Sequence, residues 1–223
     1  QKAFGGGVLT REQFLPHEMR IVAALRMQGA SDEQVIVRVK SENLFQYPTE
    51  RMVANRATVC LRRLDAMVPT DAVCAARGID PKTAVEAASS LTSLMASGTP
   101  TQADQAIFYS MICRYDIVRE LVLVEVGERL QNFDYAFTAV DLNAFMTRFT
   151  TEYPDAARWT EATVKRIKGS LRQTLRHAGL IGEGQSPESE RLSPLFLDSD
   201  VERALVQLGE QSLIAALTGR AVM

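Results

Sequence analysis

The sequence has few of the residues that most often carry catalysis or bind metals. It contains only two histidines, His17 and His177, and neither has a metal-ligand partner four residues further on. The HExxH pattern of zinc hydrolases is therefore missing. The chain also lacks the phosphate-binding GxGxxG and Walker loops and the GxSxG nucleophile turn. These absences predict a protein that is not an enzyme and that uses no cofactor or metal.

Cysteines and long apolar runs are scarce as well. The three cysteines, Cys60, Cys74 and Cys113, are widely spaced and form no CxxC pair. This usage argues against a disulfide framework and fits a reducing cytoplasm. The most apolar run, residues 121–124, is followed by Glu125 and falls far short of the roughly 20 residues that cross a bilayer. We therefore expect a cytoplasmic protein without membrane contact.

The residues that are present predict an all-α fold. Of the 223 residues, 46% are hydrophobic and 23% charged, with a net charge of −2, which is ordinary globular composition. We expect a helical, helix-turn-helix-like part over 10–98. Residues 99–223 would form a helical scaffold with a winged-helix-like end, and both parts would form one compact unit. Apolar periodicity and capping residues predict helices over 16–29, 31–41, 50–67, 138–153, 160–179 and 198–209. They also predict one or two long helices over 101–131 and two shorter ones within 70–98.

The first three helices follow the order helix, tight turn, helix, loop, basic helix, which suits a relative of the helix-turn-helix. The third of them carries four arginines away from its apolar face, so it is a candidate DNA-binding helix. Glu50 and Asp65 offset that charge, and pairing with acids is the alternative role. The four candidates are Arg51, Arg56, Arg62 and Arg63.

The strongest charge pattern lies in residues 160–181, TEATVKRIKGSLRQTLRHAGLI, which hold five Lys or Arg and one Glu. On a helix, Val164, Ile167, Leu171, Leu175 and Ala178 share one face, and four cations share an arc of roughly 80° on another. These four cations, called the basic ridge below, are Lys165, Lys168, Arg172 and Arg176, with Arg166 and Gln173 beside them.

Such a ridge suits DNA. Neutralising phosphates releases condensed counterions, and Arg and Gln can also read base edges. The plainer alternative is a solvated helix face. Residues 183–210 carry seven acids against two arginines, so the charge is interpreted as segregated rather than mixed.

Short apolar runs flank the loop that follows the basic segment. A helix, a short strand, a loop and a return strand would give a small two-stranded wing near residues 180–197. The loop contains Glu183, Glu188 and Glu190. Because these acids would repel phosphates, the helix and not the wing tip is expected to hold DNA.

Three blocks of the sequence carry a family resemblance. They are GASDEQVIVRVKSENLFQYPTERMVANRATVCLRRLDAM, FYSMICRYDIVRELVLVEV, and TEATVKRIKGSLRQTLRHAGLIGEG followed by RLSPLFLDSDVERAL. In this order they resemble the BrxA family of the BREX bacteriophage-exclusion systems, over about residues 10–208.

The resemblance implies a compact all-α protein with helix-turn-helix-like parts at both ends. It also implies binding of double-stranded DNA, no enzymatic activity, and work beside other BREX proteins that include a methyltransferase and an ATPase. The implied DNA contacts that match this sequence are Lys165, Arg166, Lys168, Arg172 and Arg176.

Three hypotheses about function remain open. The first is a DNA-binding subunit of the defence system. The second is a protein-interaction module, in which the ridge docks an acidic partner and exposed apolar residues of the tail, Leu213, Ile214 and Leu217, form the interface. The third is a transcriptional regulator, which would need a dimer and a palindromic site.

Overall fold

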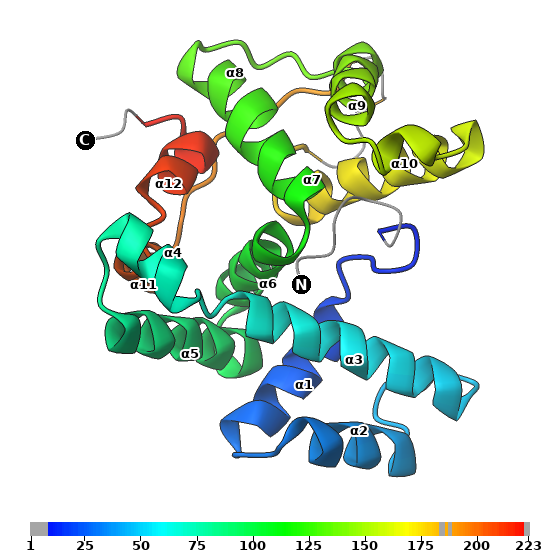
Figure 1. Ribbon diagram of the computed structural model, residues 1–223, viewed down its shortest axis with the longest axis vertical. Helices are drawn as coiled ribbons and strands as arrows, with labels where there is room; N and C mark the ends of the chain where they lie inside the picture. Colours follow the sequence, from blue (N-terminus) through cyan, green and yellow to red (C-terminus); the bar gives the residue numbers. More distant parts are fainter. Residues whose placement is uncertain (1–8, 183–185, 187–188, 221–223) are drawn as a thin grey trace. The chain divides into compact units, whose positions relative to one another are not determined.

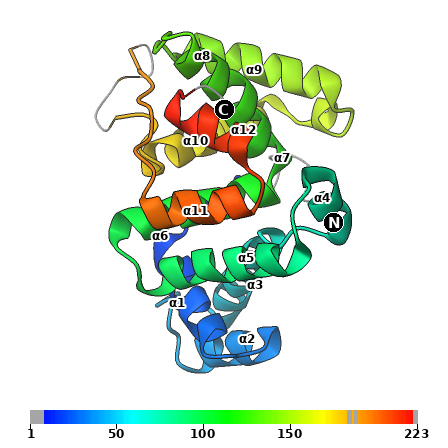
Figure 2. The ribbon, with the colours of Figure 1, turned by 90° about the vertical axis from the view of Figure 1, so that its left-hand side faces the viewer.

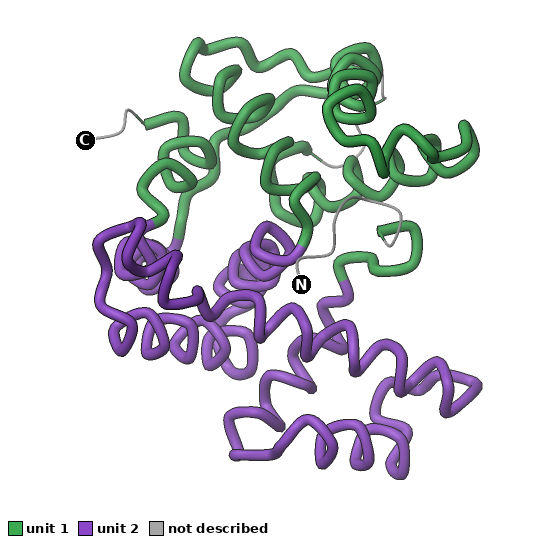
Figure 3. Tube along the Cα trace, viewed as in Figure 1, with its two compact units in different colours: residues 1–14, 115–197, 210–223 green, residues 15–114, 198–209 purple. Residues whose placement is uncertain are grey.

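The computed structural model describes residues 9–182, 186 and 189–220 (Figure 1). These residues form mainly helices, which confirms the predicted all-α fold. The chain divides into two compact units, each built from segments distant in the sequence (Figure 3). Unit 1 comprises residues 1–14, 115–197 and 210–223, and unit 2 comprises residues 15–114 and 198–209. The expected division into a helix-turn-helix-like part over 10–98 and a scaffold over 99–223, joined in one compact unit, stays a prediction.

Unit 2 begins each of its early helices where the sequence signals predict. Ser31 and Gln34 form a reciprocal capping box, and Thr49, Thr70 and Asp80 cap the three helices that follow. These caps satisfy backbone N–H groups that the first helical turn leaves unpaired. The helices are α1 (Pro16–Met27), α2 (Asp32–Ser41), α3 (Glu50–Ala66), α4 (Asp71–Arg77), α5 (Pro81–Ser97), α6 (Pro100–Arg114) and α11 (Ser199–Gln207).

The core of unit 2 lies around α5. Helix α1 packs on α5, and α11 lies beside α5 and contacts α6 (Figure 2). Asp198, the N-cap of α11, accepts a hydrogen bond from Gln102 at 3.0 Å, and its backbone N–H donates to Gln105 at 2.9 Å. Arg77 donates to the carbonyl of Leu208 at 2.8 Å. A late segment of the chain is thereby held on the early helices.

Unit 1 contains the predicted basic helix and the tail. Its helices are α7 (Asp116–Glu120), the π-helix η1 (Leu121–Val126), α8 (Gly127–Gln131), α9 (Ala139–Glu152), the 3-10 helix η2 (Ala156–Arg158), α10 (Glu161–His177) and α12 (Gln211–Thr218). The helical run predicted over 101–131 is interrupted at Tyr115, whose backbone is extended and whose hydroxyl hydrogen-bonds Glu12.

The tail is not an exposed apolar surface, so that part of the interpretation was wrong. Helix α12 packs on η1 and α8, and Leu213, Ile214 and Leu217 are all buried. The close approach needs Gly127, because a Cβ there would lie only 2.8 Å from the Cβ of Ala216. At the start of α12, the carboxylate of Glu210 accepts two hydrogen bonds from Arg119, at 3.1 and 2.8 Å. A protein interface cannot use these three side chains unless α12 leaves unit 1.

The predicted wing corresponds, among the described residues, to isolated antiparallel bridges. Ile181 pairs with Leu192, as a wing would require, but Arg191 pairs with Ala136 from the segment before α9. The return segment thus contacts a third segment that the sequence did not suggest. The tip, including Glu183 and Glu188, lies outside the described residues. A two-stranded wing stays a prediction.

Candidate nucleic-acid interface

Helix α10 is anchored to unit 1 by its apolar face. Thr160 caps its first turn by accepting a hydrogen bond from the backbone N–H of Thr163, at 3.2 Å. The predicted inner positions Ile167, Leu171 and Leu175 are each at most 1% exposed. The expected division into an apolar and a polar face is therefore confirmed, and the basic residues lie on the other side of the helix.

The N-terminal half of the basic ridge is open to solvent. Lys165 and Arg166 are exposed, and within the described part of the chain neither forms an ion pair or a side-chain hydrogen bond. Lys168 is half-buried, and its Nζ donates to Oδ1 of Asn143 on α9, at 2.6 Å. Because that partner is neutral, the positive charge of Lys168 is not compensated there. This half of α10 keeps three cations that can attract phosphates.

The C-terminal half of the ridge has a structural role. Arg172 donates from Nε to the Glu190 carboxylate at 2.7 Å, and Arg176 donates from Nη2 to its other oxygen at 2.5 Å. The Glu190 side chain is fully buried, whereas the side chains of Arg172 and Arg176 are 19% and 26% exposed. The charge is therefore less segregated than the sequence suggested, since an acid of the following segment offsets one of the two positive charges at this end of the helix.

Two further polar residues complete the outer face of α10. Gln173 is exposed and lies with its amide nitrogen 3.3 Å from Nε2 of His177. The His177 ring stacks on Phe14, with ring centroids 4.9 Å apart and planes 16° apart. Gln173 thus stays accessible for hydrogen bonding, while His177 helps to hold the segment around Phe14 against α10.

The arginines of α3 do not form one surface. Arg51 and Arg62 are exposed and, among the described residues, have no ion pair; Arg56 is half-buried. Arg63 is fully buried, with a relative exposure of 0%, so its guanidinium is not available to a phosphate in this conformation. Arg51, Arg56 and Arg62 remain candidates for nucleic-acid contact on this helix. Helix spacing alone places Arg63 off the apolar face of α3. Arg63 is nevertheless buried, because the residues packed around α3 cover more than that face.

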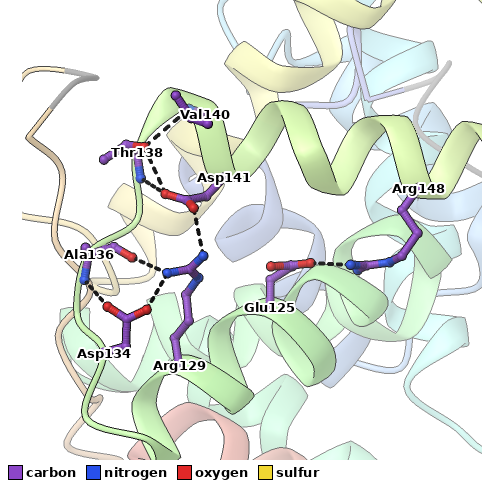
Figure 4. A network of polar contacts seen from close by, with 8 residues as sticks. All are labelled: Glu125, Arg129, Asp134, Ala136, Thr138, Val140, Asp141 and Arg148. Carbon is purple, nitrogen blue, oxygen red and sulfur yellow. Dashed lines mark hydrogen bonds and ion pairs between the residues drawn. The ribbon is translucent and has the colours of Figure 1, made fainter.

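A second distinct surface feature is the α8–α9 corner, residues 132–140. Arg129 on α8 forms ion pairs with Asp134 in this corner and with Asp141 directly after it, both at 2.7 Å (Figure 4). Asp141 also accepts from the backbone N–H of Thr138 at 2.7 Å and completes the capping box of α9. Burial raises the pKa of Asp141, but the Thr138 bonds and Arg129 outweigh it and hold that pKa below its usual range. The corner is thus a fixed loop.

This fixed corner exposes two apolar side chains. Phe133 is 76% exposed and Val140 is 73% exposed. Phe133 also has a positive φ of 57°, a conformation that costs a bulky L-residue energy. Phe133 and Val140 are thus the two large apolar side chains that this corner presents to solvent.

Glu190 and Asn143 are the residues of this surface that sequence reasoning missed. The sequence places Glu190 among the acids of a solvated loop, and no sequence pattern marks Asn143 as part of a site. Neither had a local signal, because each meets α10 through a turn of the chain rather than through helical spacing. Among the described residues, no group of His, Cys, Asp and Glu could hold a metal ion. No helix in that part of the chain has the length and apolarity to cross a membrane.

Comparison with known proteins gives the family. The BrxA family model matches residues 7–209, so the chain belongs to the BrxA family, as the resemblance predicted. It is similar to the BREX protein BrxA of Escherichia coli O9:H4 (strain HS), with 18% identity over 216 residues that cover 97% of this chain and 88% of that protein. A crystal structure of an uncharacterized protein from Magnetospirillum magneticum has the same fold, with a TM-score of 0.72 at 16% identity, covering 97% of this chain and 99% of the other.

Proposed function

We propose that this chain is a non-enzymatic, cytoplasmic component of a BREX phage-defence system and that it binds double-stranded DNA through α10. Membership of the BrxA family supports the first part. The observation that supports the second is the open half of the basic ridge, where Lys165, Arg166 and Lys168 have no acidic partner among the described residues. Phosphate contacts there would position the helix, and Gln173 on the same helix could hydrogen-bond a base or a phosphate.

Arg51 and Arg62 of α3 are proposed as further contacts with DNA. Arg172 and Arg176 are proposed instead to hold Glu190. With so few free cations, binding should be weak and strongly salt-dependent, and other BREX proteins would strengthen it on the assembled complex.

Fluorescence anisotropy with a random-sequence DNA duplex, measured at about 50 and 200 mM salt, tests this proposal. The variant Lys165→Glu breaks no contact of the fold, and Lys82→Glu, an exposed charge reversal on α5, is its matched control. We expect Lys165→Glu to weaken binding and to lower the slope of log K against log salt by about one or more, since a phosphate contact is lost. Lys82→Glu should bind like the wild type. Absence of wild-type binding, or equal loss in both variants, would contradict DNA binding through α10.

The α8–α9 corner favours a second candidate function, assembly with another BREX protein. Its exposed Phe133 and Val140 could insert into an apolar pocket of a partner. Co-expression with the other BREX proteins, followed by purification of complexes, tests this reading with Phe133→Ser against Val85→Ser on α5, which is 52% exposed. Loss of a complex only with Phe133→Ser would support assembly through the corner. Complexes of unchanged composition would exclude it.

A further inference from the structure

We infer that Asn143 of α9 is part of the DNA-binding surface and that it both orients Lys168 and donates to the same phosphate. The inference rests on the proposed function of α10. It extends the surface from one helix to two, α9 and α10, which are in contact within unit 1.

The contact fixes the orientation of the Asn143 amide. An ammonium group has three donors and no acceptor, so the group that faces Lys168 Nζ at 2.6 Å must be the amide oxygen. The Nδ2 group is the other end of the same amide, so it lies close to the Lys168 contact without taking part in it. Asn143 is exposed, and within the described part of the chain its Nδ2 has no partner. Two amide donors are therefore presented to solvent beside a cation.

This pairing differs from the other contacts of the ridge. Arg172 and Arg176 share one buried carboxylate, which offsets one of their two positive charges and holds both side chains. Lys168 is held by a neutral group, which orders its side chain and leaves its charge intact. An ordered, uncompensated ammonium beside an N–H pair matches the several acceptor oxygens of a phosphate. If the contact served only to stabilise the fold, an acidic partner would be expected for Lys168 rather than a neutral one.

The surroundings on α9 also suit an anion. The exposed side chains next to Asn143 on the same helix are Val140, Ala144 and Thr147, all uncharged. The acid nearest to Asn143 in the sequence, Asp141, is bound to Arg129 and to Thr138. A DNA strand that lies along Lys165 and Lys168 would therefore meet no free carboxylate on this part of α9.

The variant Asn143→Asp tests the inference because it keeps the shape and the acceptor for Lys168. It replaces the two donors by an oxygen and neutralises the Lys168 charge. Gln131→Glu, at the exposed end of α8, makes the same amide-to-carboxylate change elsewhere in unit 1 and serves as the matched control. Thermal unfolding is compared first, and we expect neither variant to lower Tm.

We expect Asn143→Asp to weaken binding of the random-sequence duplex by about tenfold at about 50 mM salt and to lower the salt slope by about one, as for the loss of one phosphate contact. Gln131→Glu should match the wild type. If Asn143→Asp binds like the wild type while Lys165→Glu does not, the inference fails and the proposed function stands. If both amide variants weaken binding equally, the effect is one of net charge and the inference fails. If the wild type binds no DNA, both fail.

Discussion

The buried carboxylate of Glu190 gives the sharpest prediction about the stability of unit 1. Substitution Glu190→Ala removes the two carboxylate oxygens that accept hydrogen bonds from Arg172 and Arg176. A charge-assisted hydrogen bond contributes about 1.5–3 kcal/mol, and breaking a fully buried pair costs about 3–5 kcal/mol. Because the two arginine side chains are 19% and 26% exposed, water can rehydrate them in part. We therefore expect a loss of about 2–4 kcal/mol in the free energy of unfolding.

Urea denaturation followed by tryptophan fluorescence measures this loss. The chain has a single tryptophan, Trp159, which lies in unit 1 and stacks on Phe149 with ring centroids 6.1 Å apart. Its fluorescence should therefore report on the unit that contains Glu190. The exposed acid Glu128 on α8 provides the control substitution Glu128→Ala. If the free energy of unfolding of Glu190→Ala stayed within about 0.5 kcal/mol of that control, the contacts of Glu190 with Arg172 and Arg176 would contribute no more than a surface ion pair, and the reasoning would be refuted.

A second substitution of Glu190 tests whether Arg172 and Arg176 can also contact DNA. Glu190→Gln keeps the volume of the side chain and one acceptor, and should cost less stability, about 1–2 kcal/mol. It frees positive charge at the C-terminal half of the ridge. If that half faces DNA, the salt slope of binding should become steeper by about one, because one negative charge is removed. An unchanged slope would mean that the two arginines serve only the fold.

Three further predictions concern the fold. Ser31→Ala removes a capping box and should lower the free energy of unfolding by about 1 kcal/mol in urea titration, whereas no loss would mean that the cap is redundant. Gly127→Ala should cost about 1–3 kcal/mol because the added Cβ would lie 2.8 Å from that of Ala216, and an unchanged Tm would contradict this close packing. The Tyr153 hydroxyl donates to Glu120 at 2.7 Å, and this bond, with burial, raises the pKa of Tyr153 from 10.0 to about 12. The stabilisation of the folded state by the neutral Tyr153 hydroxyl is therefore present below the unfolded-state pKa and lost as the pH rises toward 12. Tyr153→Phe should reduce this loss of stability at alkaline pH. An unaltered dependence of stability on pH would refute the prediction.

The helices could be predicted because their signals are local. Capping residues such as Ser31 and Thr49 lie where the helices begin, and Pro100 lies where α6 begins. Apolar spacing gave the buried face of α10 correctly, since a helical repeat fixes which side chains share a face. The family was also recognisable, because its three sequence blocks retain their order over most of the chain.

Long-range partners could not be predicted in this way. The tail looked exposed because its apolar residues follow the last polar loop, yet Leu213 and Leu217 are buried against η1 and α8. Arg63 has the same helical spacing as exposed arginines and is buried all the same. Charge counts over segments failed for the same reason: a carboxylate that follows a basic helix in sequence can return to offset part of its charge, as Glu190 does.

The two halves of α10 therefore illustrate how one basic helix can serve two purposes. A cation that has a buried acidic partner stabilises the fold and loses most of its attraction for a polyanion, because its charge is already compensated. A cation that is exposed, such as Lys165, or held by a neutral acceptor, such as Lys168, keeps that attraction. Counting the cations of α10 overestimates its affinity for DNA, whereas counting those without acidic partners places the surface in the N-terminal half of the helix and beside Asn143. The salt slope of binding measures the number of cations that contact phosphates. On α10 this slope should correspond to about three contacts rather than five.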